Sequence, residues 1–187
     1  SGITASYLFL AQGLVQGLGK LGLPVELTPV PHGLNRRGLG TTAACFDAPC
    51  WYEIIAQGRK LVGSAQTRRL GALLQHGSIP LQDGSTQLFR LLEFPGEEER
   101  NQACQHFRDS SITLEELNPE LTFEQVWPAL VHGFQQVLGG ELVSDQLTED
   151  EMEEAGKLYK DKYQSDLWNY EGPRRKKSFK RDQRLKG

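Results

Sequence analysis

The residues best suited to covalent chemistry are a cysteine and a lysine, Cys45 and Lys60. A cysteine attacks a thioester as the thiolate, and the ordinary pKa of a free thiol leaves only a small fraction ionised at neutral pH. A nearby ammonium group favours the thiolate, so Lys60 is a candidate for lowering the pKa of Cys45. Backbone N–H groups of residues 62–65 could bind the oxyanion that forms during acyl transfer. The simpler alternative for Cys45 is a buried thiol without a chemical role.

A β-hairpin is needed to bring these two side chains together. Residues 51–56 predict a strand, residues 57–58 a tight turn and residues 60–67 the returning strand. Such a hairpin would place the lysine beside the cysteine. A third antiparallel strand is predicted near residues 72–80.

Two segments around this hairpin resemble a known superfamily. Residues 58–66 and 74–81 resemble the lysine turn and the His-Gly-Ser/Thr strand of the lipoate and biotin protein ligases and transferases. The Cys-Phe-Asp-Ala-Pro run at 45–49, followed by Trp-Tyr-Glu, resembles the octanoyltransferases of the LipM type. The resemblance extends to about Tyr170. It implies an α+β fold, with a mixed or antiparallel sheet and flanking helices like those of the biotin/lipoate protein ligase catalytic domain.

The resemblance also implies a reaction. An octanoyl group would pass from octanoyl-acyl carrier protein to Cys45 as a thioester, and then to a lysine of a lipoyl-domain protein such as the glycine cleavage H protein. Lys60 would lower the pKa of the cysteine, and we expect no cofactor and no metal. The expected substrate-binding residues are Gly63, Ser64, Ala65, His76 and Gly77.

Three other functions remain open. A lipoate-protein ligase would activate the free acid with ATP and needs no cysteine, so Cys45 argues against it. An amidotransferase would move lipoyl or octanoyl groups between lipoyl domains. A noncatalytic acyl-binding module is the third. His76 could act as a base, but the superfamily assigns none there, and a structural hydrogen bond explains this histidine as well.

The chain departs from the family at its start. The family opens with a segment that carries an Arg-Arg-x-x-Gly-Gly turn and a following histidine, which binds the acyl chain. Residues 36–40 are only superficially similar and are better interpreted as a loop, so we expect Ser1 to be an internal starting point. We predict residues 1–146 as the main part of the catalytic domain, 147–172 as a C-terminal helical segment and 173–187 as a basic tail.

Composition excludes several classes of protein. Three cysteines in 187 residues argue against a disulfide framework and favour a cytoplasmic setting. The sequence contains no run of about 18 apolar residues, so no membrane span is predicted. Residues 173–187 hold eight Lys or Arg and one acid, whereas the net charge of the chain is −3. The tail is either a solvated extension or a steering arm for an acidic partner, and nucleic-acid binding is disfavoured because the rest of the chain is acidic.

Helical patterns surround the predicted sheet. Apolar spacing predicts a helix over 4–20, with Gly22 as its stop, and the glycines at 13, 17, 19 and 22 suggest close helix packing. Short helices are expected over 85–94 and 97–108. Capping boxes at Thr122 and Thr148 predict the starts of two further helices. We expect the buried side of the first of these helices to carry Phe123, Val126, Trp127, Leu130 and Phe134. We expect Arg59 to be solvated or to face a carrier protein.

Overall fold

The computed structural model describes residues 2–28 and 53–171. The predicted nucleophile Cys45, the loop around it and the basic tail 173–187 lie outside the described residues. The chain divides into two compact units, Ser1–Leu142 and Val143–Gly187, which are described separately below.

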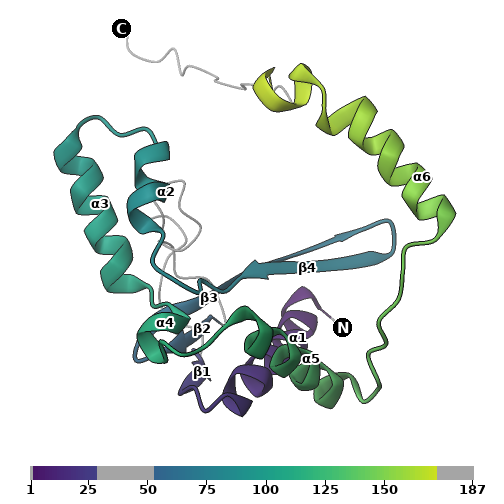
Figure 1. Ribbon diagram of the computed structural model, residues 1–187, viewed down its shortest axis with the longest axis horizontal. Helices are drawn as coiled ribbons and strands as arrows, with labels where there is room; N and C mark the ends of the chain where they lie inside the picture. The colour runs from purple at the N-terminus through teal and green to yellow at the C-terminus, as the bar shows by residue number, and fades with distance from the viewer. Residues whose placement is uncertain (1, 29–52, 172–187) are drawn as a thin grey trace, which may run out of the picture. The chain divides into compact units, whose positions relative to one another are not determined.

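The first unit is built around an antiparallel sheet (Figure 1). Its strands follow the order β1-β2-β3-β4, so each pairs with its neighbour in sequence. Antiparallel neighbours can be joined by tight turns, which agrees with the short links on either side of β3. The strands are β1 (Val25–Leu27), β2 (Ile54–Ala56), β3 (Arg59–Arg69) and β4 (Ala72–Ser78).

Both turns that flank β3 use left-handed backbone at two consecutive residues. Gln57 and Gly58 have φ of 52° and 73°, and Leu70 and Gly71 have φ of 51° and 79°. Two central residues with positive φ match the right-handed twist of the flanking strands. The predicted turns at Gly58 and Gly71 are thus confirmed.

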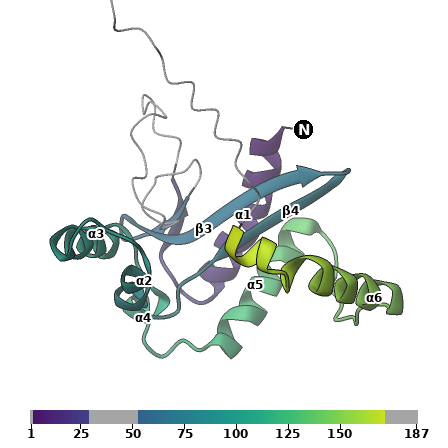
Figure 2. The ribbon, with the colours of Figure 1, turned by 90° about the horizontal axis from the view of Figure 1, so that it is seen from above.

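Helices flank the sheet, as the α+β prediction requires. Two of them, α2 and α3, lie side by side at one end of the unit (Figures 1 and 2). The helices of this unit are α1 (Ile3–Lys20), α2 (Ser85–Leu91), α3 (Glu97–Ser110), α4 (Leu114–Leu117) and α5 (Phe123–Leu138). Helix α4 was not predicted from the sequence, although Thr113 and Glu116 form the same kind of capping box that predicted other helices.

The two longest of these helices cross at glycines. A Cβ atom on Gly133 of α5 would collide with the backbone of Gly13 and Gly17 on α1, and one on Gly17 would lie 2.7 Å from Ala129 O. The close-packing interpretation is therefore confirmed for Gly13 and Gly17. It is wrong for Gly19, whose Cβ would meet open space.

Gly22 is required for its backbone conformation and not for helix packing. Its φ is 76°, and a Cβ there would meet no atom within 4 Å. A left-handed glycine commonly ends a helix, which confirms it as the predicted stop of α1.

A hydrophobic core joins these helices to the sheet. Leu18, Leu61 and Ile112 are fully buried at its centre, together with Val62 and Val126. Burial of one such side chain contributes about 1.5–3 kcal/mol, so this cluster anchors the first half of β3.

Two residues on α5 differ from expectation. We predicted that Phe123 and Trp127 are buried, but these residues are 61% and 51% exposed. The buried residues of the helix are Val126, Ala129 and Gly133, and the last two lie at the close crossing with α1.

The second unit is helical. It contains α6 (Glu149–Leu158) and two π-helical segments, η1 (Tyr159–Tyr163) and η2 (Leu167–Glu171). The predicted Thr148 capping box is confirmed, since its backbone N–H donates to Glu151 Oε2 at 2.8 Å. Among the described residues, no helix has the length and hydrophobicity needed to cross a bilayer.

A matched pair of variants tests the helix crossing. Gly133→Ala should lower the free energy of unfolding by about 1–3 kcal/mol, because the new methyl group collides with the α1 backbone. Gly19→Ala should raise it by up to about 1 kcal/mol, since alanine favours helix and nothing there obstructs it. Urea unfolding measures both. Equal changes in the free energy of unfolding for the two variants would contradict the close packing of α1 and α5 at Gly133.

Candidate functional site

The predicted lysine forms a buried ion pair. Lys60 Nζ lies 2.6 Å from Glu53 Oε1, and the two side chains are only 7% and 10% exposed. Lys60 is the second residue of β3, and Glu53 immediately precedes β2. The β2–β3 hairpin therefore brings together two charges that are seven positions apart in the sequence.

Backbone hydrogen bonds hold both members of the pair. Glu53 N donates to Thr28 Oγ1 at 3.2 Å, and Thr28 N donates to Glu53 O at 2.9 Å. On the other side, Ile112 N donates to Lys60 O at 3.0 Å. The pair is thus fixed by segments that follow β1 and α3.

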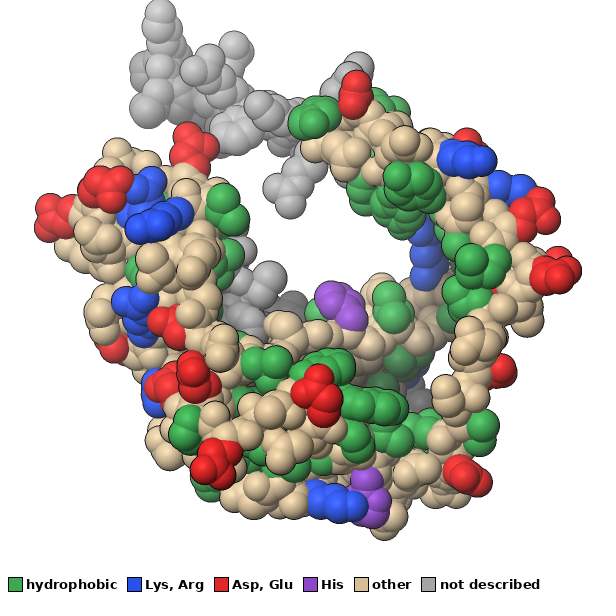
Figure 3. Space-filling model, in the orientation of Figure 1, with side chains coloured by type: hydrophobic (Ala, Val, Ile, Leu, Met, Phe, Trp, Pro, Cys, Tyr) green, Lys and Arg blue, Asp and Glu red, His purple; other side chains and the backbone are tan. Residues whose placement is uncertain are grey.

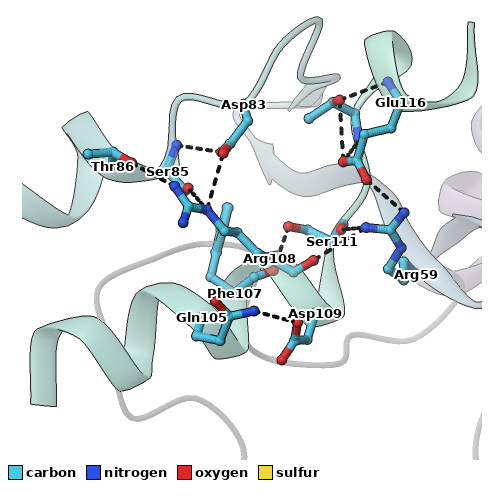
Figure 4. A network of polar contacts seen from close by, with 11 residues as sticks. Arg59, Asp83, Ser85, Thr86, Gln105, Phe107, Arg108, Asp109, Ser111 and Glu116 are labelled. Atoms are coloured by element: carbon cyan, nitrogen blue, oxygen red, sulfur yellow. Dashed lines mark hydrogen bonds and ion pairs between the residues drawn. The ribbon is translucent and has the colours of Figure 1, made fainter. Parts of the chain in front are cut away.

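Arg59, the neighbour of Lys60, joins a polar network (Figure 4). Its guanidinium lies 2.8 Å from Glu116 Oε2 and donates to Ser111 O at 3.0 Å. The expectation that Arg59 is solvated or faces a carrier is therefore wrong. It ties the start of β3 to the segment between α3 and α4.

The same close-up shows a second ion pair, at the start of α2. Arg108 Nε lies 3.1 Å from Asp83 Oδ2 and donates to Ser85 Oγ at 2.8 Å, while its Nη2 donates to Thr86 Oγ1 (Figure 4). Burial acts to raise the pKa of Asp83, but hydrogen bonds from Ser85 and the charge of Arg108 outweigh it and lower the pKa below its ordinary value of 3.8.

A cavity of about 600 Å³ lies around these two ion pairs. Its arginines, Arg59 and Arg108, each contact a carboxylate already. This arrangement fits a structural connection between α2, α3 and α4 better than a site for an anionic ligand.

A second cavity, of about 480 Å³, collects three of the five expected substrate-binding residues. Ser64, His76 and Gly77 line it, and the rest of its wall is mainly apolar. Hydrophobic side chains gather on the visible face over α5 and β4 (Figure 3). Walls of this kind suit an apolar chain with a polar group at one end. The other lining residues are Leu14, Val62, Gln75, Ile79, Leu81, Phe123, Val126, Trp127, Leu130 and Phe134.

The β3–β4 register explains how the three residues meet. Ser64 pairs with Gly77 and Ala65 pairs with His76. A Cβ on Gly77 would lie 2.5 Å from Gly63 O, so only glycine allows this close approach of the strands.

The described residues bring together only part of the predicted site. Lys60 is buried at the start of β3 and is not among the described residues that line the 480 Å³ cavity. Gly63 and Ala65 do not line it either. Cys45 lies outside the described residues, so its approach to Lys60 stays a prediction.

Sequence reasoning missed Glu53 as a functional candidate. The residue stands in the Trp-Tyr-Glu segment that supports the family resemblance, but nothing in the pattern pairs it with a particular lysine. The available signal was the hairpin itself, because residues on either side of a two-residue turn lie close in space. Among the described residues, no group of three or more His, Cys, Asp or Glu side chains is arranged to hold a metal ion.

An antiparallel sheet flanked by helices defines an α+β domain, and comparison with known families specifies its class. The family model described as the lipoyl protein ligase A/B catalytic domain matches residues 1–135. The chain belongs to this family.

Similar relatives carry the name octanoyltransferase LipM. The protein from Kyrpidia tusciae is 42% identical over 170 residues, and that from Bacillus subtilis is 34% identical over 171 residues. Each match covers 90% of this chain and 62% of the relative. The chain therefore spans less than two thirds of the length of these relatives.

Solved structures share the fold at lower identity. A bi-partite lipoate protein ligase from Thermoplasma acidophilum, studied with its E2 lipoyl domain, aligns with a TM-score of 0.72 at 23% identity, over 93% of this chain and 60% of that chain. A lipoate-protein ligase A bound with ATP aligns with a TM-score of 0.67 at 23% identity, over 90% and 59%. These matches confirm the predicted fold class.

The lowered pKa of Asp83 predicts a pH dependence. A carboxyl whose pKa is lower in the folded state stabilises the fold above its unfolded pKa, and this contribution is lost as the pH falls through the folded pKa. Asp83→Asn should therefore reduce stability at neutral pH by less than about 1 kcal/mol, because the pair with Arg108 is partly exposed.

Urea unfolding of Asp83→Asn and the unchanged protein, from neutral pH to below pH 3.8, measures this difference. The difference should shrink at the acid end. Glu93→Gln, which removes an exposed carboxylate after α2, is the control. A stability difference that stays constant over this pH range would contradict the lowered pKa of Asp83.

Proposed function

We propose that this protein transfers octanoyl groups in protein lipoylation, with Cys45 as the nucleophile. The observation that carries the proposal is the buried Lys60 at the start of β3, fifteen residues after that cysteine, in a chain of this family. The similarity to relatives named octanoyltransferase LipM supports the acyl group.

The proposed reaction has two steps. The Cys45 thiolate attacks the carbonyl carbon of octanoyl-acyl carrier protein, and the carrier's thiol leaves as the acyl-enzyme thioester forms. A lysine amine of a lipoyl-domain protein, such as the glycine cleavage H protein, then attacks this thioester. The amide forms, and the cysteine regains its thiol. The positive charge of Lys60 favours the thiolate in both steps.

The described residues can support the acyl group. Backbone groups of Gly63, Ser64 and Ala65 follow Lys60 along β3, where N–H donors could stabilise the oxyanion. Ser64, His76 and Gly77 face the apolar 480 Å³ cavity, which offers a surface for an acyl chain.

An ATP-dependent lipoate-protein ligase is the second candidate, and the solved ligases with the same fold favour it. Such an enzyme would activate the free acid as an acyl-adenylate and would not need Cys45. An amidotransferase would keep the cysteine but take its acyl group from another lipoyl domain.

Mass spectrometry separates these functions. After incubation with octanoyl-acyl carrier protein, the protein should carry one octanoyl group on Cys45 that hydroxylamine removes, since thioesters are labile to this reagent. Cys45→Ala should abolish the adduct. Cys104→Ser, which alters a cysteine on α3, should leave it unchanged. Octanoylation of a lipoyl domain by Cys45→Ala with ATP and free octanoate would instead identify a ligase.

Lys60 is tested through the reactivity of Cys45. Lys60→Ala should move the pH profile of Cys45 alkylation to higher pH and slow acyl-enzyme formation by about tenfold or more, about 1.4 kcal/mol. Lys60→Arg keeps the charge in a bulkier planar group, so partial recovery of alkylation with poor turnover is expected. Circular dichroism checks that each variant is folded. An unchanged alkylation profile in Lys60→Ala would remove the lysine from this role.

A further inference from the structure

The pairing of Lys60 with Glu53 costs free energy that an apolar pair would not. Both side chains are about nine-tenths buried, and their charged atoms lie 2.6 Å apart. Removing two ions from water costs several kcal/mol for each, and the attraction between them only roughly compensates. Well-packed apolar side chains of similar volume are often as stable or more stable. Stability alone therefore does not explain why charges occupy these positions.

We propose that Glu53 is a positioning residue of the reaction, which keeps Lys60 charged and holds its ammonium group in place for the cysteine. This inference rests on the proposed function, since it assigns Glu53 a task through Lys60. The carboxylate touches neither the acyl group nor the thiol in this role.

Burial explains why the lysine needs such a partner. A buried amine without a nearby negative charge favours its neutral form, because the ammonium loses its hydration. A neutral amine cannot favour the thiolate of Cys45. Glu53, which immediately precedes β2, supplies the counter-charge, and its own backbone is fixed by two hydrogen bonds with Thr28.

The backbone around Lys60 restricts its position further. Lys60 O accepts a hydrogen bond from Ile112 N, in the segment that follows α3. The main chain at the lysine is therefore held from the α3–α4 side, while its side chain is held from β2. The ammonium position is defined from both directions.

Glu53→Gln tests the proposal with nearly the same shape and no negative charge. The alkylation profile of Cys45 should move to higher pH, and the rate at neutral pH should fall by about tenfold, toward that of Lys60→Ala. Glu53→Asp should recover part of this loss. In the double variant with Lys60→Ala, removal of Glu53 should add nothing further, because it acts only through the lysine.

Glu116→Gln is the matched control. Glu116 is the partner of Arg59, next to Lys60 on β3, but this pair is more exposed, at 28% and 44%. The variant also removes a carboxylate, and glutamine can keep the capping box with Thr113. Its alkylation profile should stay unchanged.

Two results with Glu53→Gln would overturn the proposal. An unchanged profile in Glu53→Gln would show that the charge of Glu53 is not needed. A profile moved to lower pH would show that Glu53 weakens the lysine's effect on the thiol.

A measurement on the unchanged protein covers the case in which Glu53→Gln does not fold. Carbon-13 NMR of the lysine side chains, with the Lys60 signal identified by its loss in Lys60→Arg, should show an ammonium group at neutral pH. A neutral amine there would overturn the proposal. If the unchanged protein takes no octanoyl group while these signals behave as expected, the proposed function fails, and only the charge pairing of Glu53 with Lys60 stands.

Discussion

The structure depends on one constraint, which is that the charges of Glu53 and Lys60 leave water together. The hairpin between β2 and β3 brings these two charges together. It has two left-handed residues in its turn, Gln57 and Gly58, and an irregular register at Ile54 and Ile55. This geometry sets the two side chains 2.6 Å apart while Leu61 and Val62 enter the hydrophobic core. The same few residues of β3 thus anchor the sheet and carry the candidate catalytic charge.

The rest of the first unit restrains this strand from both ends. Near its start, the contacts of Arg59 and the hydrogen bond from Ile112 connect it to the helices that follow the sheet. Beyond the core, β3 pairs with β4 up to the turn at Leu70, and the apolar cavity lies beside the paired segment. Leu14 of α1 and Phe134 of α5 also line that cavity, and these two helices cross at glycines.

The fold is shared more widely than the proposed chemistry. Lipoate-protein ligases at 23% identity superimpose on this chain with TM-scores of 0.67 and 0.72, whereas relatives at 34–42% identity are named octanoyltransferases. A lysine at the start of a strand can serve either chemistry by binding a developing negative charge. Under the proposed function, the difference between the two is the cysteine at position 45, which adds a covalent intermediate.

The sequence by itself determined the local elements and the family. Turn glycines at 58 and 71 predicted the antiparallel strands, Thr122 and Thr148 predicted helix starts, and the lysine motif predicted the fold class, because each depends on neighbours a few residues away. Only the tertiary structure decided that Lys60 is buried against Glu53, that Arg59 is paired with Glu116, and that Phe123 and Trp127 stay exposed. The first outcome depends on the register of the β2–β3 hairpin, and the second joins β3 to a helix that comes later in the chain. The third depends on the crossing of α5 with α1, which joins segments more than a hundred residues apart.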